Sequence, residues 1–431
     1  MKKEVRAIIL GAGKGTRMHS EKPKVLHEIF SKPLLGWCIE AVQRLRNDVQ
    51  CIVVTGHKAE CVDKYINSNY ECVKTVLQKE QLGTGHAVMQ AIPLIGNFKG
   101  NVIITCGDTP CITTLTLQNL INQHEDTCSD VTVLTAEFEN PTGYGRIVRS
   151  TNNEVVEIIE EKDADEQTKK IKEVNGGIYC LNWETIKEVF TKLSNNNAQG
   201  EYYLTDIIKL AKNNSLKVSG YKISDNNEIY GINSRKNLAE AFNIINKRHL
   251  NELMDSGVTI VDTNSIFISP ETEIESDTII FPNTYIEGKN KIAKFCKVGP
   301  MARLRGGCEV GEGSKIGNFV ELKNAKIAKN TNVCHLSYIG DAELGSNINI
   351  GAGTIFANYN SITKEKKKSY LEDGVSIGSN SVLVAPVKIK KDAFIGALSV
   401  ITKDVDSSSL AITRNSQKEI KNWVKKQKGE I

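Results

Sequence analysis

A short glycine-rich stretch near the start of the chain has the residues needed to hold phosphate. Residues 9–24 are ILGAGKGTRMHSEKPK. Glycine lets a backbone approach oxygen atoms closely and point its N–H groups at them. Arg17 offers a planar fork for phosphate oxygens, and Lys24 adds a second positive charge. We therefore predict a nucleotide-phosphate site at the carboxyl end of the first strand.

Two familiar phosphate-binding loops do not fit this stretch. A Walker A loop has the pattern G-x-x-x-x-G-K-[ST]. Gly11 and Gly15 are only four positions apart, and Gly15 is followed by Thr16 where the pattern needs lysine. The dinucleotide fingerprint G-x-G-x-x-G fails as well, since Thr16 replaces its third glycine. On the residues alone, a glycine-rich turn without a ligand remains an alternative.

Four further residues could take part in chemistry. Asp108 ends the apolar run NVIITCGD, where a carboxylate suits a hard divalent cation, although such an Asp is also a common turn residue. His335 is the one histidine after residue 257, and imidazole is the usual base for an ammonium group. A lone histidine is more commonly structural. Arg305 and Lys323 are cations suited to a second phosphate.

The elements that must position the N-terminal residues alternate between strands and helices. VRAIIL, CIVVTG, NVIITCGD and DVTVLTAEF are predicted strands, and PLLGWCIEAVQRL between them has helical spacing. This alternation predicts an α/β, Rossmann-like domain with a mostly parallel sheet over residues 1–233. Residues 234–257 are predicted to form a linking amphipathic helix, with Ser234 as its N-cap and Gly257 as its stop.

The remainder, residues 258–431, has a different period. Aliphatic residues recur at every sixth position, a repeat that is typical of a parallel β-helix. A purely structural spacer is the alternative interpretation. The unbroken series is Ile274, Ile280, Ile286, Ile292, Val298, Leu304, Val310, Ile316 and Leu322, and after slips it resumes at Ile377, Leu383, Ile389, Ile395 and Ile401.

Composition excludes several classes of protein. The net charge of +4 is spread along the 431 residues, which argues against nucleic acid as the main partner. No signal-like segment or membrane-spanning apolar run is seen, so we expect a cytoplasmic protein with no membrane partner. The 11 cysteines are scattered without a CxxC pair, and we expect free thiols.

Taken together, the motifs resemble those of a known family. The N-terminal ones are GAGKGTRM, KPKVL, QKEQLGTGHA, CGDTP, PTGYGRIV, IEEKDA, EVNGGIY, GEYYLTDI and GINSR. Joined to the hexapeptide repeat, they are similar over nearly the full chain to the bifunctional N-acetylglucosamine-1-phosphate uridyltransferases and glucosamine-1-phosphate N-acetyltransferases. This resemblance implies a left-handed β-helix, Mg²⁺, the substrates UTP, acetyl-CoA and glucosamine 1-phosphate, and a homotrimer that supplies UDP-N-acetylglucosamine for envelope polysaccharide.

The resemblance also implies roles for individual residues in the N-terminal domain. Arg17 and Lys24 would be the catalytic cations, and Asp108 and Asn233 would hold the metal ion. An amide can donate and accept at once, as uracil requires, which suits Gln78. The residues implied for UTP or the UDP-sugar are Gly13, Lys24, Gln78, Gly83, Thr84, Gly145, Glu160, Asn175 and Asn233, of which Gly145, Glu160 and Asn175 hold the sugar.

In the β-helix the resemblance implies His335 as the catalytic base. Glucosamine phosphate would be bound by Arg305, Lys323, Tyr338 and Asn349. Acetyl-CoA would be bound by Ala352, Asn358, Tyr359, Ser379, Ala397 and Arg414.

The chain departs from the family pattern in three places. Gly306 replaces a usual proline, residues 258–304 are short by roughly one coil, and the loop NYNSITKEKKKSYLEDG is longer and more basic. Its lysines could contact the phosphates of coenzyme A or simply face solvent. Two alternatives remain: a nucleotidyltransferase with a structural or regulatory β-helix, and a non-catalytic interaction protein of the translation exchange-factor type.

Overall fold

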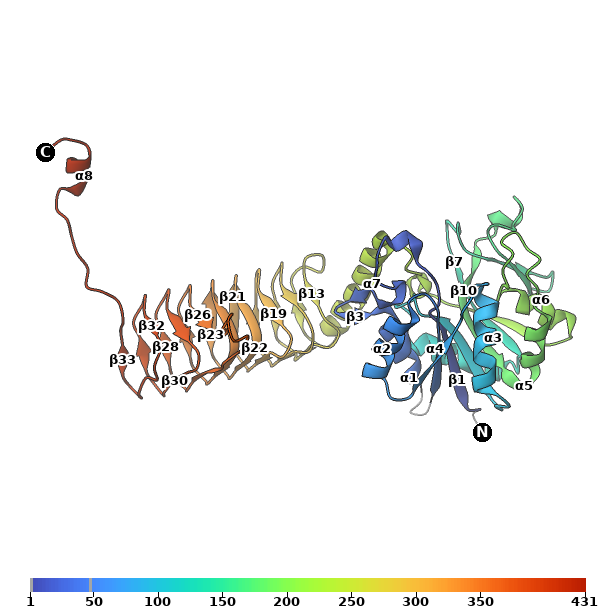
Figure 1. Cartoon of the computed structure of the whole chain (residues 1–431), viewed down its shortest axis with the longest axis horizontal. Helices are drawn as coiled ribbons and strands as arrows, with labels where there is room; N and C mark the ends of the chain where they lie inside the picture. The colour runs from blue at the N-terminus through green and yellow to red at the C-terminus, as the bar shows by residue number, and fades with distance from the viewer. Residues whose placement is uncertain (1–2, 46–48) are drawn as a thin grey trace. The chain divides into compact units, whose positions relative to one another are not determined.

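The computed structural model describes residues 3–45 and 49–431, which form two compact units (Figure 1). The units are Met1–Ile245 and Asn246–Ile431, so the division falls inside helix α7 (Arg235–Asp255). The helix expected as a separate linker therefore contributes to both units. Ser234 caps it, because its Oγ accepts a hydrogen bond from the backbone N–H of Asn237 (3.2 Å).

The first unit is built on a mixed sheet with the strand order β11-β7-β10-β6-β1-β4-β5. Strands β6, β1, β4 and β5 run parallel, as does β11 with β7, whereas β10 runs antiparallel to both of its neighbours. The mostly parallel sheet predicted from sequence is confirmed, and the reversed β10 is an addition. Its strands are β1 (Val5–Leu10), β4 (Gln50–Thr55), β5 (Val73–Leu77), β6 (Asn101–Cys106), β7 (Val131–Glu137), β8 (Arg146–Arg149), β9 (Val155–Ile159), β10 (Glu173–Asn182) and β11 (Val218–Lys222), and the small hairpin β2 (Glu28–Ile29) and β3 (Lys32–Pro33) lies apart.

Helices cover both faces of this sheet because successive strand residues point to opposite sides. In β1, Ile9 is buried in one core cluster together with Leu35 and Leu117, while Ile8 is buried in the other with Val88 and Ile207. The two faces together exclude water from every central strand. The helices are α1 (Leu34–Gln43), α2 (Ala59–Asn69), α3 (Thr84–Ile95), α4 (Thr114–Asp126), α5 (Trp183–Ile186) and α6 (Asp206–Asn213).

The second unit is a β-helix of short parallel strands that stack in successive coils. One face is formed by β12 (Thr259–Ile260), β15 (Ile279–Ile280), β18 (Lys297–Val298), β21 (Lys315–Asn318), β23 (Asn332–His335), β25 (Asn349–Ile350), β28 (Ser376–Ile377), β31 (Phe394–Ile395) and β33 (Leu410–Ala411). A second is formed by β13 (Phe267–Ile268), β16 (Tyr285–Ile286), β19 (Arg303–Arg305), β22 (Glu321–Ile327), β24 (Tyr338–Leu344), β26 (Ile355–Ala357), β29 (Val382–Val384) and β32 (Val400–Ile401). The third contains β14 (Glu273–Ile274), β17 (Lys291–Ile292), β20 (Glu309–Val310), the later halves of β22 and β24, β27 (Ser369–Leu371) and β30 (Val387–Ile389); helix α8 (Trp423–Gln427) follows near the end of the chain.

The aliphatic series found in the sequence forms the core of this β-helix. All nine residues of the unbroken series, from Ile274 to Leu322, are buried, and so are the five that resume at Ile377. The slips between the two runs have a structural cause: Leu304 pairs with Leu322, but Leu322 pairs with Ile339, so the coil shortens by one residue. The positions of the buried aliphatic residues therefore leave the six-residue repeat wherever the number of residues in a coil changes.

We predict that Gly317→Ala disrupts the stacking of two coils. A Cβ at Gly317 would lie 1.9 Å from the carbonyl oxygen of Cys334, so the backbone of one coil must move. Overpacking of this kind costs about 1–3 kcal/mol or more, and calorimetry of the full chain should show a lower unfolding temperature. Gly306→Ala is the matched control in the same unit, because its Cβ would meet its nearest atom at 3.6 Å. Equal unfolding temperatures for the two variants would contradict the prediction.

Candidate active sites

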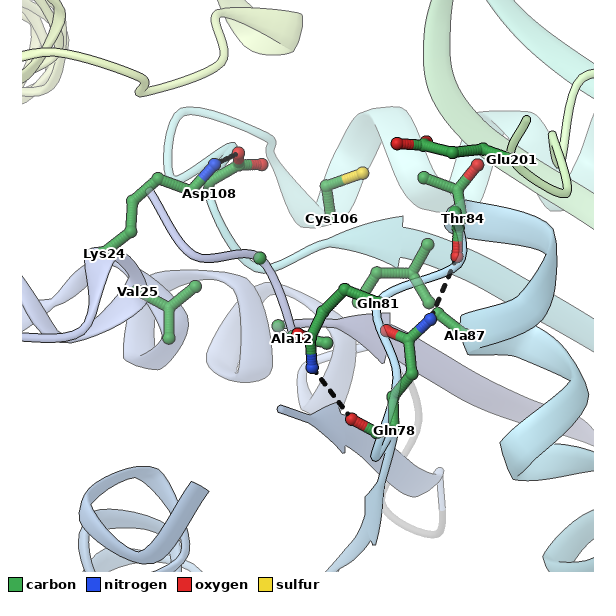
Figure 2. A pocket seen from close by; sticks show the side chains of 14 residues that line it. Ala12, Lys24, Val25, Gln78, Gln81, Thr84, Ala87, Cys106, Asp108 and Glu201 are labelled. Atoms are coloured by element: carbon green, nitrogen blue, oxygen red, sulfur yellow. Dashed lines mark hydrogen bonds and ion pairs between the residues drawn. The ribbon is translucent and has the colours of Figure 1, made fainter. Parts of the chain in front are cut away.

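A cavity of about 280 Å³ opens at the carboxyl ends of β1 and β6 in the first unit (Figure 2). The glycine-rich stretch of residues 9–24, called the phosphate stretch below, reaches the cavity directly after β1. Asp108 reaches it directly after β6. The start of α3 closes the opposite side. The residues that line the cavity are Leu10, Gly11, Ala12, Gly13, Lys24, Val25, Gln78, Gln81, Gly83, Thr84, Ala87, Cys106, Asp108 and Glu201.

Lys24, Asp108 and Asn233 converge at one end of this cavity. The Lys24 ammonium donates to Asp108 Oδ2, and it lies 3.3 Å from Asn233 Oδ1 (Figure 2 shows the first pair). The backbone N–H of Ile232 donates to the Asp108 carbonyl oxygen (2.9 Å), which fixes Asn233 beside Asp108. A carboxylate and an amide oxygen therefore already surround a positive charge. Hard oxygen donors in this arrangement suit a divalent cation, with phosphate and water oxygens completing its shell.

Gly15 and Gly13 of the phosphate stretch have different structural roles. Gly15 adopts a left-handed conformation (φ 63°), and a Cβ there would lie 2.6 Å from the Cβ of Lys24. Gly15 thus allows the Lys24 segment to pack against the loop. A Cβ at Gly13 would meet nothing within 4 Å, so this glycine leaves open space along the cavity wall.

The opposite wall is held together by pairing between the start of α3 and residues 201–204. The backbone N–H of Leu204 donates to Thr84 Oγ1 (3.1 Å), and a Cβ at Gly83 would lie 2.6 Å from the carbonyl oxygen of Tyr202. Only glycine permits this approach, since Gly83 also has a positive φ of 108°. The pairing brings Glu201 to the Thr84 side of the cavity (Figure 2).

Gln78 is buried in the cavity wall with one end of its amide already occupied. Its Nε2 donates to the carbonyl oxygen of Gly83 and lies within hydrogen-bond distance of His86 Nδ1, both at 3.1 Å. Gln81 Nε2 in turn donates to the Gln78 carbonyl oxygen (3.0 Å). Of the Gln78 amide, the Oε1 atom is therefore the one left for a ligand.

Gly145, Glu160 and Asn175 form a second group. The backbone N–H of Asn175 donates to the Gly145 carbonyl oxygen (2.9 Å), and a Cβ at Gly145 would lie 3.5 Å from Glu160 Oε2. Thr205 donates to Glu160 Oε1 (3.0 Å). Burial raises the pKa of Glu160, and the nearby Asp206 carboxylate adds to the effect.

Cys106 connects this second group to the cavity. Its thiol lines the cavity and contacts the carbonyl oxygen of Gly177 (3.8 Å), while the Gly177 N–H donates to Asn175 Oδ1 (2.9 Å). Tyr179 also donates to Asn175 Oδ1 (3.1 Å), which leaves the Nδ2 end of that amide for a ligand. Burial raises the pKa of the Cys106 thiol to about 12, with a further contribution from Asp108, so the thiol stays protonated.

In the β-helix, His335 belongs to a column of residues that occupy the same position in successive coils. Asn318 pairs directly with His335 where β21 meets β23. Small side chains follow on the next coils, because β23 pairs with β25, β25 with β28 and β28 with β31. Arg414 Nη1 donates to the carbonyl oxygen of Ala397, the last of them (2.7 Å). The column is Asn318, His335, Ala352, Ser379 and Ala397.

The contact with Asn318 determines which ring nitrogen of the neutral His335 imidazole carries the proton. Its Nδ1 lies 2.7 Å from Asn318 Oδ1. Because that oxygen only accepts, the neutral imidazole carries its proton on Nδ1, and Nε2 keeps a free lone pair. His335 is exposed, so this lone pair is accessible to a substrate.

Cations gather on the adjoining face of the β-helix. Arg305 and Lys323 are direct neighbours in the register of β19 and β22. Partial burial lowers the pKa of Lys323, and the positive charges of Lys366 and Arg305 lower it further. Arg305 Nη1 is 3.2 Å from Glu321 Oε1. This face therefore concentrates positive charge where an anion would be stabilised.

Two further predicted residues lie beside these cations. A Cβ at Gly340 would meet the Tyr338 hydroxyl at 2.3 Å and Asn358 Nδ2 at 2.8 Å, so both side chains lie over this glycine. Asn358 is buried and donates to Asp341 Oδ2 (2.5 Å). Tyr359 is exposed and forms a bridge with Lys366 across the long basic loop, and Asn349 is exposed on β25.

Comparisons with known proteins agree with both halves of this geometry. Residues 6–227 match the family model described as nucleotidyl transferase. A protein of Thermosipho melanesiensis described as bifunctional protein GlmU is 44% identical over 459 residues, covering 99% of this chain and 98% of the relative. A protein of the same description from Acetivibrio thermocellus is 42% identical over 451 residues, covering 97% and 96%. A solved structure of UDP-glucose pyrophosphorylase with UDP-glucose, 20% identical with a TM-score of 0.47, covers 57% of this chain and 100% of its own, a likeness too weak to carry an argument.

This chain belongs to the GlmU family.

The 459-residue alignment is longer than the 431-residue chain, so the first of these GlmU relatives has residues that this chain lacks. One coil of this chain is longer than the coil that follows it. Phe356 pairs with Leu383, 27 residues later, whereas Leu383 pairs with Ile401 after 18. The extra residues include the basic loop that contains Lys366.

Five of the nine residues implied for UTP or the UDP-sugar line the cavity: Gly13, Lys24, Gln78, Gly83 and Thr84. The other four, Gly145, Glu160, Asn175 and Asn233, do not line it, and neither does Arg17. Arg17 lies in the exposed 3₁₀ turn Thr16–Met18. Within residues 3–45 and 49–431, no group of three or more His, Cys, Asp and Glu side chains is placed to hold a metal ion. In the same ranges, no helix has the length and apolar character that crossing a membrane requires.

Gln81 and Glu201 had no predicted role, and Lys366 was predicted only as one of the lysines of the basic loop. Gln81 and Glu201 line the cavity and lie inside motifs that carried the family resemblance, QKEQLGTGHA and GEYYLTDI. The motifs marked them, but only the pairing of residues 201–204 with α3 shows why Glu201 is near. Lys366 lies in the departing loop, where the basic run was the one available signal.

We predict that Gly15→Ala impairs the nucleotide site by displacing Lys24. The new Cβ would lie 2.6 Å from the Lys24 Cβ, and the left-handed backbone would be strained as well. UTP binding measured by calorimetry should weaken by about tenfold or more, since misplacement of this size is costly. Gly96→Ala controls for backbone strain, because Gly96 also has a positive φ (59°) but open space around it. Equal UTP affinity in both variants would contradict the prediction.

Proposed function

We propose that this chain makes UDP-N-acetylglucosamine in two steps. The β-helix transfers an acetyl group from acetyl-CoA to the amine of glucosamine 1-phosphate. The first unit then transfers a uridylyl group from UTP to the product and releases pyrophosphate. The observation that carries the proposal is that one GlmU-family chain has both a nucleotidyl transferase cavity and the His335 column. Because UTP and acetyl-CoA are cytoplasmic metabolites, we place the enzyme in the cytoplasm.

Acetyl transfer follows from the free lone pair of His335 Nε2. The substrate amine is an ammonium ion in solution, and it must lose a proton before it can attack. His335 accepts that proton, the amine nitrogen bonds to the thioester carbonyl carbon, and the carbon–sulfur bond then breaks to release coenzyme A. The small residues Ala352, Ser379 and Ala397 beside His335 suit the narrow arm of coenzyme A, and Arg414 suits its phosphates.

The cation cluster next to this column supports the choice of a sugar phosphate. Arg305 and Lys323 are the proposed phosphate ligands, and Lys366 adds a third positive charge beside them. Tyr338 and Asn349 offer hydroxyl and amide groups for the sugar. Asn358 and Tyr359 remain proposed contacts of acetyl-CoA.

Uridylyl transfer needs charge neutralisation and alignment rather than a protein nucleophile. A phosphate oxygen of the sugar phosphate attacks the α-phosphorus of UTP, and the bond to pyrophosphate breaks on the opposite side. Lys24 lies in the cavity where the triphosphate would enter, and Gly13 leaves room beside it. Arg17 is exposed outside the cavity lining, so its proposed role requires its side chain to turn inward.

Mg²⁺ is the proposed metal ion, held by Asp108 and Asn233. When bound, it would neutralise charge on the phosphate oxygens. The two side chains fit this task because their oxygens already converge on the ammonium of Lys24.

The remaining contacts determine which base and sugar are accepted. Gln78 Oε1 is free to accept a hydrogen bond, as the N3–H of uracil requires. Asn175 Nδ2 can donate to the sugar, and Glu160 can accept from a hydroxyl. Gly145, Gly83 and Thr84 shape the space between them.

The main alternative is a nucleotidyltransferase whose β-helix is only structural or regulatory. A structural coil has no need for an exposed imidazole with a free Nε2 beside clustered cations. The His335 column therefore favours the two-step enzyme.

We predict that His335→Ala and Asp108→Asn each remove one of the two activities. His335→Ala should lower acetyl transfer by about 10²–10⁴-fold, the usual worth of a general base, and leave uridylyl transfer intact. Asp108→Asn should lower uridylyl transfer by about 10²-fold or more and leave acetyl transfer intact. Coenzyme A release is followed by thiol titration and pyrophosphate release by a coupled assay, so each variant is the folding control for the other. Full acetyl transfer by His335→Ala would remove the base assignment.

We also propose that the chain forms a homotrimer through the β-helix. Met301, Phe319 and Leu336 occupy one corner of successive coils, and they are 47%, 54% and 59% exposed. All three have left-handed backbones (φ 56°, 56° and 48°), a conformation that bulky residues rarely adopt. An exposed apolar ridge beside His335 suits contact with further copies of the chain.

We predict that Phe319→Glu dissociates this assembly. A buried, unpaired carboxylate at the centre of the ridge would oppose association. Light scattering should give a trimeric mass for the unchanged chain and a lower mass for the variant. Leu115→Glu is the control, since it makes the same kind of change at a residue that is 69% exposed in the other unit. A monomeric mass for the unchanged chain would refute the trimer.

A further inference from the structure

The segments that contain Lys24, Asp108 and Asn233 must meet to form the proposed uridylyl-transfer site. A backbone hydrogen bond joins the last two. The hydrogen bond from Ile232 N–H to the Asp108 carbonyl oxygen joins the segment of Asn233 to that of Asp108. In the described part of the chain, no backbone hydrogen bond joins residues 22–30 to residues 231–237. Lys24 contacts Asp108 and Asn233 only through its ammonium, and a bound triphosphate would compete for that group.

His27 supplies a link between these two segments. It ends the 3₁₀ turn Lys24–Leu26, and its backbone N–H donates to the Lys24 carbonyl oxygen (3.1 Å). Its side-chain Nδ1 lies 3.2 Å from Nη1 of Arg235, the first residue of α7. A guanidinium group only donates hydrogen bonds, so Nδ1 must accept, and the imidazole is neutral with its proton on Nε2.

A second contact shows that the segment as a whole is fastened to α7. The rings of Phe30 and Phe242 stack with their centroids 4.3 Å apart. His27 is only 5% exposed, so its bond with Arg235 is shielded from water. The stacked rings hold the far end of the segment, and the His27–Arg235 bond holds the end nearest to Lys24.

We propose that His27 is a positioning residue for uridylyl transfer: by accepting a hydrogen bond from Arg235, its neutral imidazole holds Lys24 in register with Asn233 and Asp108. His27 touches neither substrate nor metal and acts through Lys24. This inference rests on the proposed function of the first unit.

The chemistry of the link makes it sensitive to acid. Burial lowers the pKa of His27, and the positive charges of Arg235 on α7 and Lys22 on its own segment lower it further. A hydrogen bond with the backbone of Lys22 and the negative charge of Glu28 oppose this lowering without cancelling it. Because the pKa in the folded chain lies below the usual value of 6.5, the native state favours the neutral ring. The link is therefore intact at neutral pH and is lost as the pH falls below that lowered pKa, since a protonated Nδ1 cannot accept.

We predict different outcomes for two substitutions of His27. His27→Leu removes the acceptor and should lower kcat/KM for uridylyl transfer by about 10- to 100-fold, as expected for a misplaced binding group. His27→Asn keeps an acceptor at the position of Nδ1 but does not titrate, so it should retain most of the rate at pH 7.5. The sugar phosphate and Glu160 also titrate in acid. The test therefore compares the pH profiles of kcat/KM for uridylyl transfer in the two proteins. The fall of kcat/KM in acid should be smaller in His27→Asn than in the unchanged chain.

Two controls separate positioning from folding. Acetyl transfer by the same preparations should be unchanged, because it takes place in the other unit. His124→Asn is the matched variant: His124 is 2% exposed, burial lowers its pKa to about 4, and its Nδ1 lies 2.9 Å from Thr132 Oγ1, away from the cavity lining. His124→Asn should leave the pH profile of uridylyl transfer unaltered.

The outcomes that overturn the inference are distinct from failure of the proposed function. Normal uridylyl transfer in His27→Leu, or an unchanged acid decline in His27→Asn, would overturn it. Arg235→Met should resemble His27→Leu, and the double variant should be little worse than either; additive losses would also count against the link. If the unchanged chain made no UDP-sugar at all, the proposed function would fail, and UTP affinity by calorimetry would then decide: weaker binding in His27→Leu supports the inference, and equal binding overturns it.

Discussion

Parallel strand pairing is the constraint on which both sites depend. Strands that run in the same direction end at the same edge, so β1 delivers the phosphate stretch and β6 delivers Asp108 to one place. In the β-helix the same geometry stacks each residue over its counterpart one coil earlier, which places Asn318 against His335. Residues far apart in the sequence thus become neighbours through backbone hydrogen bonds, and their own side chains need not attract one another.

This constraint explains how much of the molecule could be predicted from its sequence. The buried series from Ile274 to Leu322 was visible because each coil must fill the same narrow core, which is filled mainly by aliphatic side chains. The strands of the first unit were visible for a similar reason, since both faces of the sheet are covered. The reversal of β10 was not, because the direction of a strand depends on its connections and leaves no mark on its own residues.

The sites were less accessible to sequence reasoning, for physical reasons that differ from residue to residue. Asn233 could be placed near Asp108 only through family resemblance, since the bond from Ile232 to Asp108 is a backbone contact that any sequence could make. The expectation that Gln78 both donates and accepts toward uracil met a competitor, because its Nε2 is used by Gly83. The glycines of the site were the easiest residues to identify from the sequence. The structure requires glycine at Gly15 and Gly83, because a Cβ there would collide with Lys24 and Tyr202, respectively.

The two proposed phosphate sites differ in how their cations are neutralised. In the first unit Lys24 is paired with Asp108, so a triphosphate bound at the proposed site would replace that carboxylate as the partner of Lys24. In the proposed mechanism, a metal ion would then take the place of the Lys24 ammonium between Asp108 and Asn233. In the β-helix Lys323 faces the like charges of Arg305 and Lys366, which lower its pKa, so an incoming phosphate relieves repulsion. Arg305 beside it is paired with Glu321, so a phosphate at the proposed glucosamine-phosphate site would replace that carboxylate as well as screen Lys323 from its positive neighbours.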